Sequence, residues 1–280
     1  MPELPELEAF VRAQRETLTR EPIAAIPVAH FATVKTIDPP LRSLIGQRFE
    51  VIGRRAKRLL FRAEDENTLM VHLMSAGKLA LAQKHTRSAV LVVGFESGTE
   101  LVMTEGGSKR RAGAWLLSPQ ALEQELAHIG PEPLDPSFTV DVLARAAQEH
   151  PHLLHGFLRD QRAIAGIGRA FANEILHAAM LSPNTRSAKL DRAELERLHT
   201  AIVGVLGAAV KRLVPLSTKG LTTKAGRGYV VHDREGALCP RCGDRIRTVS
   251  FDEYTVYYCA TCQTGGRVLA DRRMSRLLRD

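Results

Sequence analysis

The sequence CPRCGDRIRTVSFDEYTVYYCATC, residues 239–262, contains all four cysteines of the chain. They form two Cys-x-x-Cys pairs separated by sixteen residues. Each pair can place two thiolates on one metal ion, and two pairs complete a closed tetrahedral site, which is structural rather than catalytic. A reducing cytosol disfavours disulfide bonds, and a redox-active Cys-x-x-Cys needs no matched partner. We therefore expect one structural Zn²⁺ bound by Cys239, Cys242, Cys259 and Cys262.

Two β-rich runs, 246–249 and 255–258, lie between the cysteine pairs and predict the strands of a hairpin. The C-terminal region is therefore expected to be a zinc-ribbon-like finger over residues 236–265. A basic tail follows over residues 266–280, and its apolar residues have helix-like spacing.

Upstream of the finger, helical periodicity predicts four helices, over residues 140–149, 153–159, 169–180 and 193–213. The second and third flank the turn Ala165-Gly166-Ile167-Gly168. Glycine there lets the backbone approach a ligand, and the helix start that follows favours an anion such as phosphate. The alternative is a helix–helix corner packed through small residues. We expect a helical domain over residues 137–235.

The first half of the chain has a different pattern. Residues 3–18 predict a helix, and short β-rich runs follow it. These runs are 49–52, 58–62, 69–73, 89–95, 100–104 and 114–117. Residues 130–136, Gly-Pro-Glu-Pro-Leu-Asp-Pro, break every regular pattern and predict a linker. We therefore predict an α+β fold, in which an antiparallel β-sandwich or barrel over residues 1–129 precedes the helical domain and the finger.

Composition narrows the functional class. The chain has 280 residues, of which 44% are hydrophobic and 25% charged, as in ordinary globular proteins. Its 39 Lys and Arg against 31 Asp and Glu give a formal net charge of +8, which favours a polyanionic partner such as nucleic acid. The longest apolar run, 201–210, is too short to cross a bilayer, and the start MPELPELE is acidic where a secretion signal is basic. We expect a soluble cytoplasmic protein.

The amino terminus suggests covalent chemistry. The small residue after Met1 permits removal of the methionine, which leaves Pro2 with a free secondary amine. An α-amino group titrates near pH 8, so a usable fraction is neutral and nucleophilic in the cytoplasm. A secondary amine that attacks a sugar C1′ gives an iminium ion, which promotes loss of a base and then β-elimination. Glu3 is next to this amine and is a candidate acid and base.

Further motifs are spread over nearly the whole chain. They are PELPE at 2–6, RAKRL at 55–59, HLMS at 72–75, KRRAGAW at 109–115, IGPEPL at 129–134, GIGR at 166–169 and the four-cysteine finger. Together they resemble the formamidopyrimidine-DNA glycosylase and endonuclease VIII family of base-excision repair enzymes. The resemblance implies an N-terminal β-sandwich, a helix-two-turn-helix domain and a zinc finger, with damaged double-stranded DNA as the partner. It also implies base removal followed by β,δ-elimination. We expect the protein to be a monomer.

The resemblance also implies roles for individual residues. Pro2 resembles the Schiff-base nucleophile, Glu3 the general acid, and Lys57 the phosphate-contacting lysine that supports elimination. Other residues match positions that contact DNA or lie near the lesion pocket: Met74, His85, Arg110, His155, Arg169 and Glu174. Among these, Arg110 matches the arginine that enters the space left by the extruded base, and Met74 is the candidate wedge.

Some departures from the family pattern concern the substrate. HLMSAG places Met74 one residue earlier than the commoner HLGMSG, which would change its side of the strand. Ala112 stands where an aromatic wedge is expected, and residues 214–238 look shorter than a loop that covers extruded 8-oxoguanine. We therefore predict a preference for endonuclease-VIII-type substrates, namely oxidised pyrimidines, hydantoins and abasic sites. The alternative is an 8-oxoguanine or formamidopyrimidine glycosylase.

Other departures concern the DNA phosphates. Arg169 replaces the usual asparagine after the Gly-x-Gly turn, and His155 occupies a position often held by lysine. Tyr254 stands where the family finger usually carries a phosphate-contacting arginine. Tyrosine cannot supply that charge, so either another basic residue such as Arg247 or Arg267 replaces it, or δ-elimination is weakened.

Two non-enzymatic readings compete with this one. A catalytically weak damaged-DNA-binding protein would have the same basic surface and finger, but it has no need for both Pro2 and Glu3. An RNA-binding zinc-ribbon protein would be expected to have more stacking aromatic residues than the 5% found here.

Overall fold

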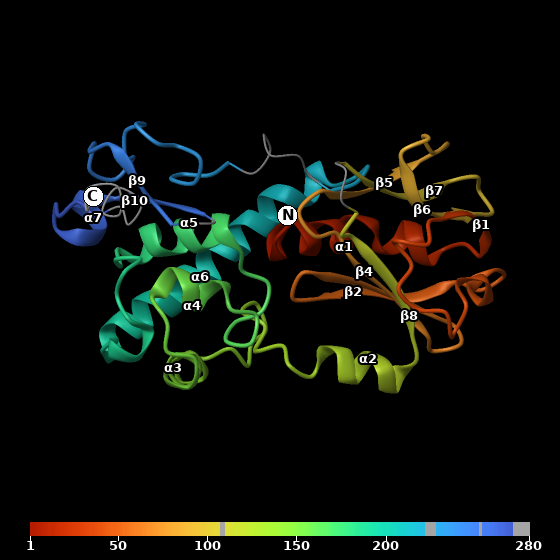
Figure 1. Cartoon of the computed structure of the whole chain (residues 1–280), viewed down its shortest axis with the longest axis horizontal. Helices are drawn as coiled ribbons and strands as arrows, with labels where there is room; N and C mark the ends of the chain where they lie inside the picture. Colours follow the sequence, from red (N-terminus) through yellow and green to blue (C-terminus); the bar gives the residue numbers. More distant parts are fainter. Residues whose placement is uncertain (107–109, 222–227, 252–253, 271–280) are drawn as a thin grey trace, which may run out of the picture. The chain divides into compact units, whose positions relative to one another are not determined.

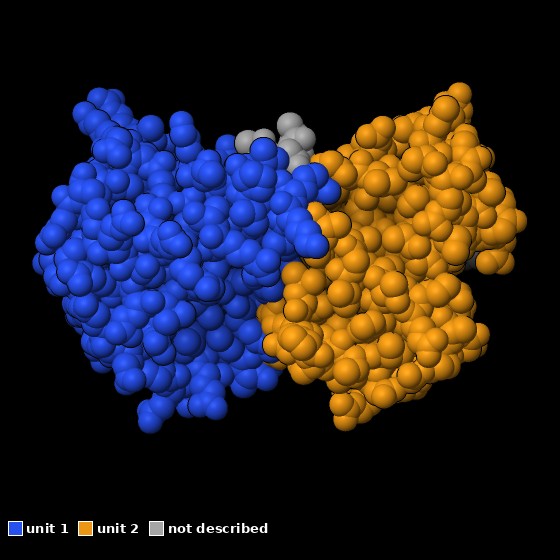
Figure 2. All heavy atoms as spheres, turned by 180° about the vertical axis from the view of Figure 1, so that it is seen from behind, with its two compact units in different colours: residues 1–128, 209–227 blue, residues 129–208, 228–280 orange. Residues whose placement is uncertain are grey.

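The structure is a computed structural model of the chain that describes residues 1–106, 110–221, 228–251 and 254–270. Lys109 of the KRRAGAW motif, part of the loop predicted over 214–238 and most of the predicted tail lie outside these residues. The chain forms two compact units, 1–128 with 209–227, and 129–208 with 228–280 (Figure 2). This division assigns residues 209–227 to the first unit, whereas the sequence places them in the helical domain.

The first unit is built of strands that follow an N-terminal helix. Its elements are α1 (Leu4–Thr19), β1 (Ile23–Ala29), η1 (Leu41–Leu44), β2 (Phe49–Arg55), β3 (Arg58–Ala63), β4 (Thr68–His72), β5 (Gly77–Ala82), β6 (Ala89–Phe95), β7 (Glu100–Glu105), β8 (Gly113–Leu117) and α2 (Pro119–Leu126). The strands form two antiparallel sheets, in the orders β1-β6-β7-β5 and β2-β3-β4-β8 (Figure 1). The predicted β-sandwich is confirmed.

One hydrophobic core joins the two sheets and α1. Phe49 of β2 contacts Phe61 of β3, with ring centroids 5.3 Å apart, and reaches Phe95 of β6 in the other sheet at 6.3 Å. Leu7 and Phe10 of α1 are buried in the same cluster. The Phe49–Phe95 pair thus joins the two layers of the sandwich, and such pairs add stabilisation beyond the apolar area that they bury.

The sequence missed the two strands at the edges of one sheet. β1 contains Pro27 and pairs with β6 through two register shifts, so its alternation is irregular. Proline is tolerated there because one side of an edge strand has no ladder to complete. β5 is paired at its outer edge with residues 219–221, through hydrogen bonds to Leu79 and Leu81, so a segment distant in sequence protects it.

The second unit contains the predicted helices and the finger. Its elements are α3 (Val140–Glu149), α4 (Leu154–Arg159), α5 (Arg169–Ala179), η2 (Ser187–Lys189), the greater part of α6 (Arg192–Leu213), β9 (Ile246–Ser250), β10 (Thr255–Cys259) and α7 (Ala260–Thr264). The remainder of α6 and η3 (Val214–Leu216) belong to the first unit. The four helices and the finger hairpin are confirmed, as is the α+β fold.

Within the described part of the chain, one helical segment, 192–216, is long and apolar enough to cross a membrane. Its buried residues include Leu198, Ile202 and Leu206, which recur at helical spacing on one face. This is the pattern of a core helix with one solvated side.

Candidate DNA-binding and metal sites

The amino terminus is held by a buried carboxylate. Glu3 is the N-cap of α1 and is 5% exposed, and its backbone N–H donates to Oε2 of Glu6 at 2.9 Å. Glu3 and Glu6 form a capping box, and Pro5 lies in the first turn, where it costs no hydrogen bond. The PELPE motif therefore has a structural role besides the chemical one expected from the sequence, because it fixes the residue that follows Pro2.

Lys57 lies in the tight turn between β2 and β3. Its side chain is buried, at 8% exposure, and the preceding Ala56 has a left-handed φ of 50°. The guanidinium of Arg54, in the same hairpin, pairs with Glu8 of α1 at 2.9 Å, so the turn is attached to the helix that begins at the amino terminus. Burial, reinforced by neighbouring positive charges that include Lys57, lowers the pKa of His72 to about 4. His72 is therefore neutral beside this lysine.

Met74 lies in a turn rather than on a strand. β4 ends at His72, and Met74 follows with φ of 48°, a strained value for a side chain with a Cβ atom. The N–H of Gly77 donates to Leu73 O at 2.8 Å, and a Cβ on Gly77 would lie 2.4 Å from that oxygen. The prediction that Met74 changes its side of a strand is therefore wrong, because the strand has already ended.

The other two candidates of the first unit lie on connections between strands. His85 pairs with Glu100 at 2.9 Å and remains partly exposed. Arg110 is exposed, and Oε1 of the buried Glu105 accepts the backbone N–H groups of the two residues that follow it, at 2.7 and 3.0 Å. The second of these, Ala112, is fully buried. Glu105 thus anchors the connection that carries Arg110, and Ala112 offers no wedge.

In the second unit, Gln161 shapes the Gly-x-Gly turn between α4 and α5. Its Nε2 donates to Arg159 O at 2.8 Å and to Ile167 O at 2.9 Å, and its Oε1 accepts the N–H of Gly166 at 2.8 Å. Gly166 has a φ of 82°, which favours glycine. One amide side chain therefore satisfies three backbone groups of a turn that forms no regular ladder.

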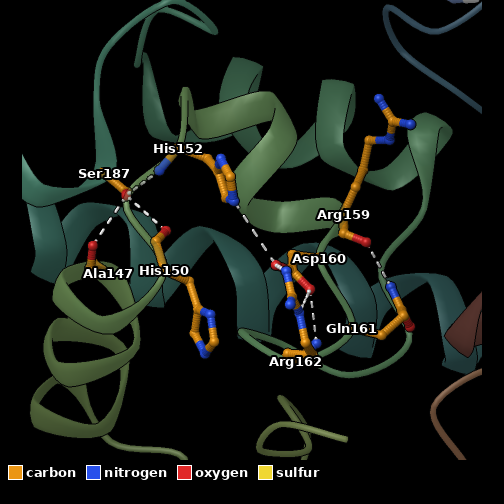
Figure 3. A network of polar contacts seen from close by, with 8 residues as sticks. All are labelled: Ala147, His150, His152, Arg159, Asp160, Gln161, Arg162 and Ser187. Atoms are coloured by element: carbon orange, nitrogen blue, oxygen red, sulfur yellow. Dashed lines mark hydrogen bonds and ion pairs between the residues drawn. The ribbon is translucent and has the colours of Figure 1, made fainter. Parts of the chain in front are cut away.

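Asp160 is the C-cap residue of α4 and fixes the end of that helix. It accepts the backbone N–H of Arg162 at 3.0 Å and the guanidinium at 2.8 and 3.1 Å, and it lies 4.0 Å from the ring of His152 (Figure 3). In the same view the Arg159 side chain points away from Asp160 and Arg162. The network therefore holds the helix end while Arg159 extends elsewhere.

Arg159 extends over Tyr254, in a stack that also contains two predicted residues. Its guanidinium carbon lies 4.2 Å from the Tyr254 ring centroid, and that of Arg169 lies 5.8 Å from it. The ring of His155 stacks on Tyr254 at 5.4 Å. The three departures noted separately in the sequence, at 155, 169 and 254, thus meet at one place. Sequence reasoning missed Arg159, although it lies one helical turn after His155.

His155 is a neutral member of this stack. It is 3% exposed, and a backbone hydrogen bond to Arg169 only partly offsets the effect of this burial on its pKa. Burial, followed by the charge of Arg159, lowers the pKa of His155 to about 3. The imidazole therefore acts as a flat apolar ring that supports Tyr254, and not as a positive charge in place of lysine.

Glu174 is a structural hub of the second unit. It is 7% exposed, and its carboxylate accepts the backbone N–H groups of Val230, Val231 and His232 at 2.8 to 2.9 Å. Its neighbour Asn173 donates to the ring of His232 and accepts the N–H of Tyr257 in β10. Helix α5 therefore holds both the finger and the segment that leads into it.

The four cysteine sulfurs lie within 4.8 Å of one another. Two Sγ–Sγ distances, Cys239 to Cys262 and Cys242 to Cys259, are 3.9 and 3.4 Å. Four thiolates about 2.3 Å from a tetrahedral zinc lie about 3.8 Å apart, so the set fits this ion. The finger also includes Leu269 of the predicted tail, which is buried.

The chain matches three known domain families. Residues 1–115 match the formamidopyrimidine-DNA glycosylase N-terminal domain, residues 129–218 the H2TH domain of the same enzyme, and residues 236–265 the zinc finger found in FPG and IleRS. The formamidopyrimidine-DNA glycosylase of Chloroflexus aurantiacus is 35% identical over 275 residues, covering 94% of this chain and 98% of the relative. An "Uncharacterized formamidopyrimidine-DNA glycosylase-like protein" of Mycobacterium tuberculosis is 46% identical over 151 residues, covering 54% and 94%.

Solved structures agree in fold. The structure of MutM in complex with DNA that contains carbocyclic 8-oxo-G has a TM-score of 0.82 and 25% identity, and covers 94% of this chain and all of that one. The complex between Lactococcus lactis Fpg and abasic-site DNA has a TM-score of 0.84 at 24% identity, with 94% and 99% covered. The chain therefore belongs to the formamidopyrimidine-DNA glycosylase family, whose members are DNA glycosylases. The predicted family, enzyme class and zinc finger are confirmed.

The buried His155 should make stability depend on pH. Its folded pKa lies below its ordinary value, so the unfolded chain binds more protons between about pH 3 and 6.5, and stability falls as pH falls through that range. We expect the free energy of unfolding of His155→Phe to fall less steeply, by up to about 1.4 kcal/mol per pH unit. Urea unfolding at pH 4.5 to 7.5 measures this. Equal slopes in the two proteins would contradict it, since other titrating groups are common to both.

Proposed function

We propose that this chain is a base-excision-repair glycosylase with abasic-site lyase activity, which acts as a monomer on damaged double-stranded DNA in a bacterial cytoplasm. The observation that carries the proposal is the Pro2-Glu3 terminus, held by a capping box at the start of α1 in a member of this family. A rigid terminus favours an amine nucleophile, because positioning lowers the entropic cost of attack.

The proposed reaction begins at Pro2. With Met1 removed, the secondary amine bonds to C1′ of the damaged nucleotide as the bond from C1′ to the base breaks. The nitrogen then loses its proton and the bond from C1′ to the ring oxygen O4′ breaks as that oxygen takes a proton. The iminium ion that results has no nitrogen proton to lose and therefore remains a cation. Loss of the C2′ proton gives an enamine, whose electron pair expels the 3′ phosphate, and a second elimination expels the 5′ phosphate. Glu3 moves the protons, and Lys57 binds a phosphate.

The stack at Tyr254 supports a phosphate contact made by arginines of the helices. We propose that Arg159 and Arg169, held over the Tyr254 ring, supply the charge that a finger arginine would otherwise carry. Both are guanidinium groups, which suit the oxygen pairs of phosphate. This assignment replaces Arg247 and Arg267, the residues that the sequence suggests. The structural Zn²⁺, bound by the four cysteines, stabilises the hairpin that carries Tyr254.

The lesion class has two candidates. We propose an endonuclease-VIII-like preference for oxidised pyrimidines, hydantoins and abasic sites, supported by the buried Ala112, which leaves no aromatic ring against the opposite base. The second candidate is a formamidopyrimidine or 8-oxoguanine glycosylase. The name of the Chloroflexus aurantiacus relative favours that second candidate.

Borohydride trapping tests the nucleophile. Protein with Met1 removed should form a stable covalent band on a duplex with one abasic site, because reduction fixes the iminium linkage. The same protein with an amino-terminal extension left in place should bind the duplex and give no band. Zinc-loaded, DNA-binding protein with a free Pro2 that forms no band would instead support the alternative, a catalytically weak damaged-DNA-binding protein.

A panel of single-lesion duplexes tests the substrate. We expect faster base removal from an oxidised pyrimidine or a hydantoin than from 8-oxoguanine opposite cytosine, measured as single-turnover rates. If 8-oxoguanine opposite cytosine is the fastest base lesion, the second candidate is correct.

Salt dependence of binding tests the arginine contact. Arg159→Gln should weaken binding to an abasic-analogue duplex and reduce the slope of log affinity against log salt by about 0.9, the value for one lost phosphate contact. Arg145→Gln is the matched control, since it removes the same charge from an exposed position on α3 of the same unit. Equal effects of both variants would show a general charge effect and not a contact.

A further inference from the structure

Helix α5 presents three buried polar side chains to the finger and its lead-in segment. Asn173, Glu174 and His177 are 1%, 7% and 5% exposed. Glu174 binds backbone N–H groups and Asn173 binds the His232 ring and one backbone N–H, as described above, whereas His177 reaches a cysteine. Its Nε2 lies 3.2 Å from Sγ of Cys239, which is itself 2% exposed. One side of a single helix thus contacts the strand hairpin, the lead-in segment and a cysteine of the metal site.

The direction of the His177 hydrogen bond follows from the chemistry of the sulfur. A cysteine that coordinates zinc is deprotonated, so its sulfur can only accept a hydrogen bond. Nε2 of His177 must therefore carry the hydrogen, and the ring is the Nε2–H tautomer.

The contact explains why a polar ring lies at this position. His177 follows Ile175 and Leu176, which are also buried, so an apolar side chain would suit the packing. A buried imidazole is costly unless it is hydrogen-bonded. Four thiolates on one Zn²⁺ leave a net charge of −2, and a donor aimed at one sulfur disperses part of that charge. The N–H donor of the imidazole and the acceptor sulfur of the metal site therefore each have a hydrogen-bond partner.

We propose that His177 is a positioning residue of the zinc site, which donates its Nε2–H to the Cys239 thiolate, slows zinc loss and links the metal to α5. The link matters because α5 begins with Arg169 and holds residues 230–232 through Glu174. This inference concerns metal retention and goes beyond the reaction on DNA. Partners of this kind around metal ligands change metal affinity by about 10- to 100-fold.

Zinc release from the full chain tests the proposal, with a colorimetric chelator as the readout. We expect His177→Phe to release zinc at least about tenfold faster than the unmodified protein. His177→Gln keeps an N–H donor of similar reach, so it should release zinc at a rate close to the original. If His177→Phe fails to fold, zinc release from His177→Gln tests the proposal instead. A rate close to the original supports the proposal, and a much faster rate overturns it.

The matched control is His199→Phe. His199 is a partly buried histidine on α6 of the same unit, and its Nε2 contacts Phe138 O at 2.6 Å. This variant also loses a histidine hydrogen bond, so it reports the effect of general destabilisation. It should release zinc at the original rate. Release from His177→Phe that equals that of the unmodified protein or of His199→Phe would overturn the proposal.

Cobalt substitution separates a donor from a ligand. The visible absorption of Co²⁺ in the finger should indicate four sulfur ligands and keep that pattern in His177→Phe. A spectrum of three sulfurs and one nitrogen that changes in the variant would make His177 a ligand and overturn the proposal. Neither measurement uses DNA, so the result is independent of the proposed glycosylase and lyase activities.

Discussion

Three buried carboxylates that accept backbone N–H groups fix the segments on which the candidate sites depend. Glu6 holds the N–H of Glu3, Glu105 holds the two residues after Arg110, and Glu174 holds residues 230–232. In each case the backbone N–H groups of the held segment lie outside the regular hydrogen-bond pattern of a helix or sheet. A carboxylate is strong enough as an acceptor to replace that ladder, and a buried group left unpaired costs about 1–3 kcal/mol.

This arrangement explains how segments of usually flexible kinds can be held in place. A chain terminus and a strand connection are normally the least ordered parts of a domain. Here they are attached to α1 and β7, whose own positions are set by the hydrophobic core of the sandwich. The core thus fixes the elements to which the segments of Pro2 and Arg110 are attached. The carboxylates fix the backbone conformation of those segments.

The sequence predicts what local pattern encodes. The helices 140–149, 169–179 and 192–213 have strong apolar periodicity, and the cysteine spacing specifies a metal site, so these features could be found. β1 and β5 could not, because edge strands carry proline, small residues and register shifts. The roles of Glu174 and Gln161 were missed for a different reason. Their partners are backbone groups, which leave no trace in the identity of the residues that they hold.

The stack at Tyr254 shows the same limit of sequence-based prediction, and it also shows how spatial neighbours explain departures from the family pattern. His155, Arg169 and Tyr254 each look like a separate loss or gain of charge when compared with the family pattern. In the structure they share one stack with Arg159, in which a neutral imidazole and a phenol form a flat support for guanidinium groups. The charge that tyrosine cannot supply is thus present at the same place in space, because the guanidinium of Arg159 on α4 lies 4.2 Å from the Tyr254 ring. Departures that are unexplained one at a time are therefore best interpreted together, because a change at one position is compensated by its neighbours in space and not in sequence.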